Sequence, residues 1–426
     1  MSNTYKFSSI IFCLFLIISF FYGYNVQEIH GASDIDANGH TWPAINSFNK
    51  ENFYETLLTY GKFGENSYPL HHIIYGKLLN FNSGNIIFTL TTTLISFLYT
   101  FLIYYVFKSK FKELSLYTII FLSLLILSSP YFRGSAYWGL TENTGYIFLG
   151  FAIYFFNKST EKKDFSMIHF YLCIFSALAL YARPQLIFFT IFILLFYFFL
   201  VENKKIFLNL IFTFFCFSLP GFFLIWKWGG LIDEKNYPDD FEYFVNIYTI
   251  PQTFMVILSL MAVYLFPFFI LNNLSKFNFA FLKKIFLNTI IFSLVLFLFF
   301  IFLKIDILYL DEERILPYGQ GFVIYLSYLI TKIDYSFIPI AAFGLFLCIE
   351  FTKISKKNLL IFFSIVLIFS LRVHFFTEYL DPLILILALI LFDHKTEFKV
   401  NLEKSWSIYL MFFYYSCLLY GKILIL

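Results

Sequence analysis

Arginine, charge and paired cysteines are all scarce in this chain of 426 residues. Charged residues make up only 13% of it, about half the share found in a soluble globular domain. The five cysteines lie in apolar runs without C-x-x-C spacing, which argues against a metal centre or a disulfide framework. No phosphate-binding G-x-x-x-x-G-K-[ST] loop is present, which argues against an ATP-driven pump.

Long apolar runs fill the chain instead. Hydrophobic residues make up 60% of the sequence, and the runs of about 17–22 residues are each long enough to cross a hydrocarbon core of roughly 30 Å. We therefore expect an all-α polytopic membrane protein with about 12–13 transmembrane helices, forming a single integral membrane domain over residues 1–426 without a soluble domain. The expected helices cover about residues 7–24, 86–107, 114–129, 144–157, 168–182, 185–201, 206–225, 251–271, 285–303, 335–351, 358–371, 380–392 and 406–426.

Lysine clusters predict the orientation of these helices, because lysine-rich loops normally lie on the cytoplasmic side. Neighbouring clusters are then joined by helical hairpins that turn on the outer side. We expect a bacterial inner (cytoplasmic) membrane protein whose first extracytoplasmic loop, residues 25–84, is long. The clusters are Lys108, Lys110 and Lys112; Lys158, Lys162 and Lys163; Lys204 and Lys205; Lys276, Lys283 and Lys284; Lys353, Lys356 and Lys357; and Lys395, Lys399 and Lys404.

The four arginines fall on the opposite, outward side of this arrangement. They are Arg133, Arg183, Arg314 and Arg372. This is unusual, because positive charge normally gathers on the cytoplasmic side. A guanidinium group binds a phosphate with two hydrogen bonds at once, so the pattern is typical of a protein that handles a phosphate-bearing molecule on the outer face.

Two carboxylates, Asp34 and Asp36, follow the first expected helix. In an extended segment they point the same way, so the pair could share a metal ion, or one carboxylate could act as a general base. A turn or capping role is the alternative.

Farther along the first loop, residues 42–45 and 53–58 predict amphipathic helices that lie along the membrane surface. His71 and His72 come next, at the entry to the second transmembrane helix. They could hydrogen-bond a phosphate or a sugar hydroxyl. Satisfaction by water or backbone is the alternative, and metal binding is the weaker interpretation because adjacent histidines on a helix rarely bind one ion.

The second outer stretch, residues 130–143, holds Arg133 and Glu142. Glu142 lies at an expected helix start, where a carboxylate suits the helix dipole, so capping and catalytic support both remain open. Arg183 precedes Pro184 at the turn of a membrane-embedded hairpin. Charged groups at such depth usually serve a function, and the alternative is an arginine that reaches the lipid headgroups. Arg372 and His374 point the same way in an extended turn and could together clamp a phosphoryl group.

In this order along the chain, the motifs resemble those of the GT-C glycosyltransferases, integral membrane enzymes that take a sugar from a polyprenyl-phosphate donor. The resemblance implies that Asp36 or Asp34 is the catalytic carboxylate, with Asp36 preferred, and that Glu142 supports catalysis. It implies substrate binding by the cationic and imidazole groups of the outer side. The matching segments are Asp34-Ile35-Asp36, Tyr68-Pro69-Leu70-His71-His72, Thr141-Glu142-Asn143, Leu180-Tyr181-Ala182-Arg183-Pro184 and Glu378-Tyr379-Leu380-Asp381-Pro382, and the implied substrate-binding residues are Arg133, Arg183, Arg372, His374, His71 and His72.

The resemblance further implies an inverting transfer of a sugar to a lipid, glycan or protein acceptor in cell-envelope glycan assembly. We expect membrane lipids, the donor and the acceptor as partners, and no nucleic acid. No cofactor is required, and the aspartate pair permits a divalent metal. The rival predictions are a polysaccharide polymerase that joins lipid-linked repeats and a non-enzymatic lipid or glycan transporter, for which repeated halves and charges along the helices are typical.

Overall fold

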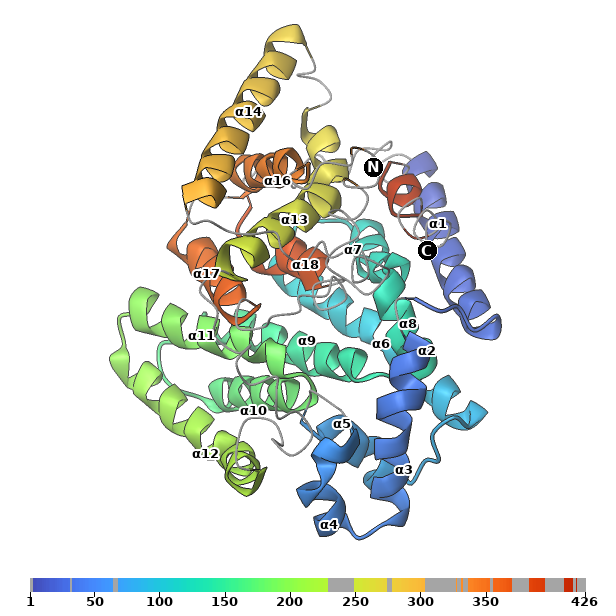
Figure 1. The fold of residues 1–426 in the computed structure, drawn as a ribbon. Coiled ribbons are helices and arrows are strands. Elements are labelled where there is room, and N and C mark those ends of the chain that lie inside the picture. Colours follow the sequence, from blue (N-terminus) through green and yellow to red (C-terminus); the bar gives the residue numbers. More distant parts are fainter. Residues whose placement is uncertain are drawn as a thin grey trace. The chain divides into compact units, whose positions relative to one another are not determined.

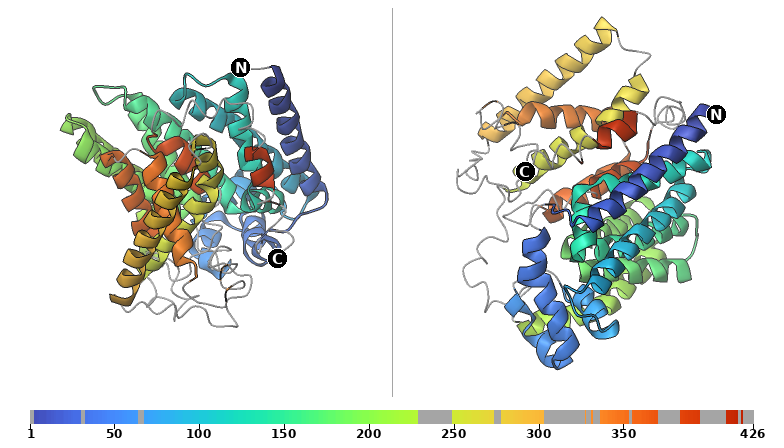
Figure 2. Two further views of the ribbon diagram at one scale, coloured as in Figure 1. Left: turned by 90° about the horizontal axis from the view of Figure 1, so that it is seen from above. Right: turned by 90° about the vertical axis from the view of Figure 1, so that its right-hand side faces the viewer.

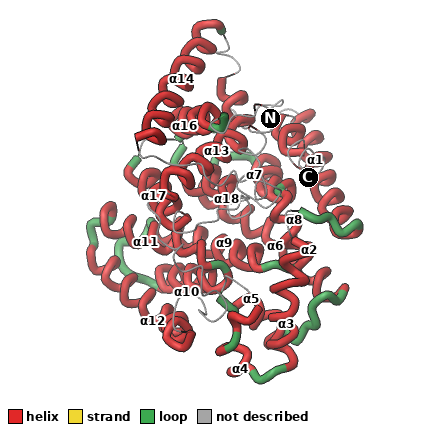
Figure 3. Tube along the Cα trace, in the orientation of Figure 1, coloured by secondary structure: helices red, strands yellow, loops and turns green. Residues whose placement is uncertain are grey.

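The computed structural model describes most of the chain as helices and connecting loops. It covers residues 3–30, 33–63, 68–228, 249–273, 278–302, 336–352, 355–369, 383–394 and 410–416, together with 327, 331 and 419. Within these ranges the chain is helical and no strand forms (Figure 3). The chain divides into two compact units: unit 1 comprises residues 1–16, 113–129 and 245–426, and unit 2 comprises residues 17–112 and 130–244.

Four of the described helices are long and apolar enough to cross a membrane, and a fifth span results if the broken pair Leu116–Ser128 and Pro130–Trp138 is counted as one. The four are Asn3–Asn25, Ile86–Lys110, Lys204–Trp228 and Phe279–Leu298. Several of their large apolar side chains are more than half exposed, among them Phe212, Phe286 and Leu298. Exposed apolar surface of this extent is typical of a lipid-facing protein, so the helices indicate that the protein is integrated in a membrane.

Five helices form the body of unit 2 (Figure 1). They are α6 (Ile86–Lys110), α9 (Thr141–Ser159), α10 (Met167–Ala182), α11 (Ile187–Leu200) and α12 (Lys204–Trp228). Helix α10 packs against α9, α11 and α12, and α9 packs against α6. Each of these helices falls within a few residues of an expected span, because a long uninterrupted apolar run predicts a membrane-spanning helix.

One end of unit 2 gathers its three lysine-rich loops. Asn157 donates from Nδ2 to Ser109 Oγ at 3.3 Å, and Asn203 donates from Nδ2 to the carbonyl of Lys163 at 2.9 Å. An exposed ion pair of 4.0 Å joins Lys112 to Glu161. The three expected cytoplasmic loops of unit 2 therefore meet one another, which leaves the other helix ends together at the opposite end.

Short helices occupy the segment between α1 (Asn3–Asn25) and α6. They include the two expected short helices, α3 (Trp42–Lys50) and α4 (Phe53–Leu58). Asn52 caps α4, because its side-chain oxygen accepts from the N–H groups of Tyr54 and Glu55. The others are α2 (Ser33–Asp36), the π-helical segments Ala37–Thr41 (η1) and Ile73–Leu78 (η3), the 3-10 turn Tyr60–Phe63 (η2) and α5 (Leu70–His72).

The expected extended geometry of Asp34 and Asp36 is wrong. Both belong to α2, which continues through η1 into α3 with helical dihedral angles at Asp36 and Thr41. Residues two apart on a helix do not face each other, so the two carboxylates point to different sides. The sequence Ser33-Asp34-Ile35-Asp36 has the composition of a helix start, with acidic residues in the first turn.

The expected loop over residues 130–143 is also mostly helical. Helix α8 (Pro130–Trp138) follows α7 (Leu116–Leu124) and the 3-10 turn Leu125–Ser128 (η4). Proline is tolerated at the start of α8, where its missing N–H has no helical partner. Within α8, Gly134 lies so close to the backbone of His30 and to Ser33 that an added Cβ would come within 3.2 Å of both. Packing against α2 thus stabilises α8, although its glycine and serine residues made the segment resemble a loop in the sequence.

A tyrosine from α10 enters the hydrogen-bond ladder of α12. The Tyr181 hydroxyl donates to the carbonyl of Phe217 at 2.6 Å and accepts from the N–H of Gly221 at 3.0 Å. In a regular α-helix these two backbone groups bond to each other. Pro220 lies inside α12 at the same place, where proline removes a backbone donor and favours a kink.

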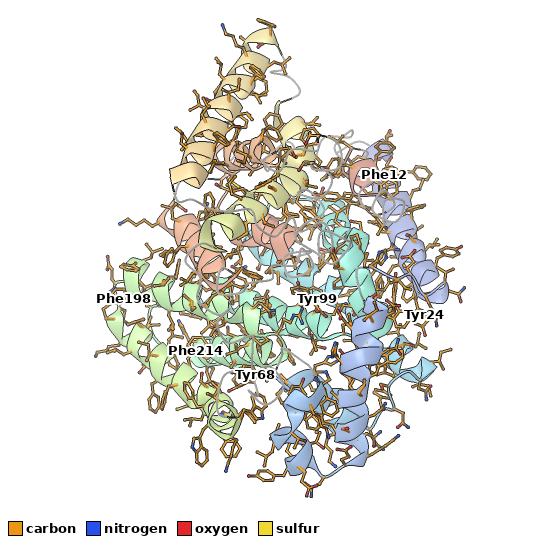
Figure 4. All side chains as sticks on the ribbon, viewed as in Figure 1. Phe12, Tyr24, Tyr68, Tyr99, Phe198 and Phe214 are labelled. Atoms are coloured by element: carbon orange, nitrogen blue, oxygen red, sulfur yellow. The ribbon has the colours of Figure 1, made fainter. Side chains whose placement is uncertain are left out.

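Aromatic rings join the end of α12 to the short helices. Trp228 stacks with Tyr60 and Tyr68 at centroid distances of 6.0 and 5.9 Å, and its indole N–H donates to the carbonyl of Leu57 at 3.1 Å. Tyr68, labelled in Figure 4, also meets the ring of Tyr181 edge-on at 5.8 Å. Because Tyr60 and Tyr68 are both stacked against Trp228, this cluster joins α12 to the short helices.

The described part of unit 1 also consists of packed helices. Helix α16 (Ile338–Phe351) packs against α13 (Thr249–Asn273) and α14 (Phe279–Phe302), as Figure 2 shows. Gly344 brings α16 close to the backbone of Leu258. This unit also includes the first part of α1, helix α7, the η4 turn, α17 (Lys356–Phe369), α18 (Leu383–Ile386) and the π-helical segment Leu387–Leu391 (η10). The predictions for Arg314, for Arg372 and His374, and for most of the helix at 406–426 lie outside the described residues.

Candidate functional site

The end of unit 2 opposite the lysine loops holds a cluster of charged and polar side chains. It lies where the end of α1, helix α8, the start of α9 and the end of α10 meet. Gly139 shapes the turn between α8 and α9 with a φ of 67°, a value that favours glycine. An added Cβ at Gly139 would lie 2.5 Å from the Phe88 ring, so both backbone and packing require glycine there.

Arg133 is wholly buried in this cluster. Its Nη1 bonds Glu28 Oε2 at 3.1 Å and the carbonyl of Ser19 at 3.2 Å, and its Nη2 donates to Ser19 Oγ at 2.7 Å. His30 Nε2 lies 3.1 Å from the same Glu28 oxygen. A buried guanidinium is tolerated only when it is paired and hydrogen-bonded, and here the cation holds the end of α1 against α8.

The surroundings of Glu28 favour its ionised form. Burial of the carboxyl group opposes ionisation, but the hydrogen bond from His30 and the charge of Arg133 outweigh that effect. The pKa of Glu28 is therefore below its ordinary value.

Two tryptophans connect this ion cluster to α3. Trp42 and Trp138 stack with their ring centroids 5.8 Å apart. The Trp42 indole donates to the carbonyl of Trp138 at 2.8 Å, and the Trp138 indole donates to the carbonyl of Glu28 at 3.2 Å. The helix that begins with Asp34 and Asp36 is thus fixed to the C-terminal end of α8.

Arg183 forms the second ion pair of the cluster. Its Nη2 lies 2.6 Å from Glu142 Oε1, and its Nη1 donates to Thr141 Oγ1 at 3.1 Å. The side chains of Arg183 and Glu142 are 16% and 14% exposed, whereas Arg133 is not exposed at all. Arg183 lies at the expected turn, between α10 and the 3-10 turn Pro184–Leu186 (η5), and it brings that turn against the start of α9.

Ser135 links the two arginine ion pairs of the cluster. Its hydroxyl lies 3.4 Å from Glu142 Oε2 and accepts from the N–H of Asn143 at 3.2 Å. It is two residues from Arg133 on α8. Glu142, the carboxylate paired with Arg183, is therefore held by α8, the helix that carries the buried Arg133.

His71 and His72 are both buried. His71 contacts Thr144 Oγ1 through Nδ1 at 2.8 Å and the carbonyl of Gly139 through Nε2 at 3.0 Å. His72 Nδ1 lies 2.7 Å from the Tyr60 hydroxyl. These bonds fasten α5 to the turn at Gly139 and to the short helices, so the two histidines support the site from within.

Asp34 and Asp36 are partly exposed at the start of the α2–α3 helix, beside α8. Asn38 Nδ2 donates to the backbone carbonyl of Asp34 at 2.8 Å. Because the two carboxylates point to different sides of the helix, they do not form a chelating pair for one metal ion. Among the residues that the structure describes, no three His, Cys, Asp or Glu side chains come together as a metal-binding group.

The sequence-based prediction missed Glu28, His30 and the Trp42–Trp138 pair. A weak signal was present, because Glu28 and His30 are polar residues two apart directly after an apolar helix. Their partner Arg133 is more than one hundred residues away along the chain, so the ion cluster becomes visible only in the folded structure.

No protein-family model, no curated protein and no solved structure matches this chain. The functional interpretation therefore depends on the residues and their geometry.

Proposed function

We propose that this protein is a membrane glycosyltransferase that transfers a sugar from a polyprenyl-phosphate-linked donor to an acceptor on the extracytoplasmic face. The observation that carries the proposal is the partly exposed Arg183, whose partner Glu142 is hydrogen-bonded by Ser135 of α8, the helix against which the helix of Asp34 and Asp36 packs. A cation for the phosphate and a carboxylate for the acceptor thus belong to one polar region of an apolar, membrane-integrated protein. The GT-C-like order of motifs along the chain supports the same conclusion.

In the proposed reaction, the acceptor hydroxyl oxygen attacks the anomeric carbon of the donor sugar. The bond from that carbon to the phosphate oxygen breaks, and the polyprenyl phosphate leaves with the electron pair. Asp36 or Asp34 takes the hydroxyl proton as general base. Direct attack inverts the configuration at the anomeric carbon.

The arginines have different parts in this proposal. Arg183 neutralises the phosphate as its charge increases, the kind of electrostatic help that contributes most to many enzymatic rate enhancements. Arg133 is wholly buried and engaged with Glu28, so it holds the frame and does not contact the donor. Arg372 and His374 remain proposed contributors to phosphate binding.

The proposal extends to the surroundings of the protein. It includes a bacterial inner-membrane location, an outward-facing site, a GT-C-like fold with 12–13 spans, and a role in cell-envelope glycan assembly. The acceptor is a lipid, a glycan or a protein.

The test is sugar transfer by purified protein from a polyprenyl-phosphate sugar. We expect Arg183→Gln to lower the rate about 100-fold, as removal of one preorganised donor does elsewhere. Since the two aspartates point to different sides of their helix, we expect only one of Asp36→Asn and Asp34→Asn to abolish transfer. Asp164→Asn is the matched control, because Asp164 accepts from Asn203 at the lysine-loop end of unit 2. Full transfer in both aspartate variants would refute the catalytic role.

A further inference from the structure

A carboxylate lies directly against Arg183, the described arginine to which the proposed function assigns the donor phosphate. Glu142 Oε1 is 2.6 Å from Arg183 Nη2, and the two side chains are exposed to almost the same extent, 14% and 16%. Any anion that reaches the guanidinium therefore also comes within a few ångströms of the carboxylate. An anion at this site is therefore attracted by Arg183 and repelled by Glu142.

The rest of the cluster does not add positive charge. Arg133 is paired with Glu28, and Asp34 and Asp36 start the helix that packs beside α8. Among the described residues of this cluster, a phosphate at Arg183 thus meets no excess of cationic charge. Binding there depends on the geometry of hydrogen bonds more than on the sum of charges.

Repulsion from a carboxylate grows in proportion to the charge of the ligand. A phosphodiester carries one negative charge, whereas a phosphate monoester carries about 1.5–2 at neutral pH. The carboxylate of Glu142 therefore weakens binding of a monoester more than binding of a diester. In the proposed reaction, the donor is a diester of phosphate and the lipid product is a monoester.

From this geometry we infer that Glu142 is a specificity-determining residue of the proposed phosphate site, which balances Arg183 so that a singly charged phosphodiester is favoured and the doubly charged phosphate monoester is released. The inference rests on the proposed function and gives Glu142 a role different from proton transfer. Glu142 acts on the ligand by electrostatic repulsion, which partly offsets the attraction of the ligand to Arg183.

The test compares three lipid probes with the same farnesyl tail on the full-length protein in detergent. Methyl farnesyl phosphate is the diester, farnesyl phosphate is the monoester, and farnesol is the uncharged control. Binding is measured at pH 8, where the monoester carries nearly two charges. The readout is the ratio of the two phosphate affinities, which a purely structural role of Glu142 would not change.

We expect Glu142→Gln to tighten binding of the monoester about five-fold more than binding of the diester, the size expected for one added charge–charge repulsion in water-like surroundings. Glu142→Ser is a second variant that removes the charge, and it leaves room for water to hydrate Arg183 if the first variant does not fold. Glu142→Asp retains the charge and should retain the wild-type ratio. Glu51→Gln is the matched control, since Glu51 pairs with Lys62 at 3.3 Å elsewhere in unit 2.

An unchanged affinity ratio in a folded Glu142→Gln or Glu142→Ser protein would overturn the inference, even when Arg183→Gln abolishes binding of both phosphates. A different failure would concern the proposed function itself. If neither phosphate binds the wild-type protein better than farnesol does, the phosphate site is refuted and the role of Glu142 falls with it.

Discussion

The two arginines of unit 2 have opposite surroundings. Arg133 is sealed among Ser19, Glu28 and the helices around them, with no exposed surface. Arg183 lies at a turn, shares its charge with one carboxylate and keeps part of its surface accessible. The same side-chain chemistry is therefore wholly enclosed in one place and partly exposed in the other, and under the proposed function this difference in burial separates a structural arginine from a ligand-binding one.

The largest expected effect comes from removing the buried arginine. Arg133→Met leaves Glu28 without its main cation, and loss of one partner of a buried ion pair costs about 3–5 kcal/mol. Arg183→Met should cost about 1–2 kcal/mol, because water can still reach Glu142. Thermal unfolding in detergent measures both variants, and equal destabilisation would remove the distinction between the two arginines.

A substitution in the turn between α8 and α9 should have the second-largest effect on stability. Gly139→Ala should destabilise the protein by about 1–3 kcal/mol, because alanine is strained at this φ and its Cβ would collide with Phe88. Gly39→Ala is the control, since an added Cβ there meets nothing within 4 Å. That control should change stability by no more than about 1 kcal/mol, in the stabilising direction. A tolerated Gly139→Ala would show that the turn does not depend on this backbone conformation.

Acid should weaken the buried cluster selectively. The pKa of Glu28 is lower in the folded protein than its ordinary value, so its contribution to stability is complete above the unfolded pKa of about 4.3. That contribution is lost as the pH falls through the folded pKa. We expect wild-type stability to decline more steeply than that of Glu28→Gln below about pH 4.3, as measured by the unfolding temperature across pH. Parallel curves would contradict the assignment.

The smallest effect belongs to an exposed ion pair on the short helices. Lys62 and Glu51 lie 3.3 Å apart with side chains that are nearly half exposed. Lys62→Ala should change stability by about 0–1 kcal/mol, because solvent screens such pairs. Its thermal unfolding, measured beside that of Arg133→Met, gives the lower limit of the comparison. A loss as large as that of Arg133→Met would mean that burial does not govern the strength of these pairs.

Local patterns predicted the helices better than the site. Apolar runs located α6, α9, α10, α11 and α12 within a few residues, because a long uninterrupted apolar stretch is enough to predict a membrane-spanning helix. The turn at Arg183 was also predicted, since proline after arginine ends α10. These features depend on neighbouring residues in the sequence.

The errors occurred where distant segments decide the structure. Helix α8 is supported by the approach of Gly134 to His30 and Ser33, which no local pattern announces. The direction of Asp34 and Asp36 changed once their segment proved to be helical. The residues predicted for the site remain a prediction, and only the fold revealed that Glu142 is the partner of Arg183.

The hydroxyl of Tyr181 has a mechanical consequence. It bridges two backbone groups of α12, and it is only two residues from the arginine that the proposed reaction uses. Straightening or bending α12 at that point changes the gap that the hydroxyl fills, and the movement passes along the last turn of α10. A displacement of α12 at this point would therefore act on α10 about half a helical turn before Arg183.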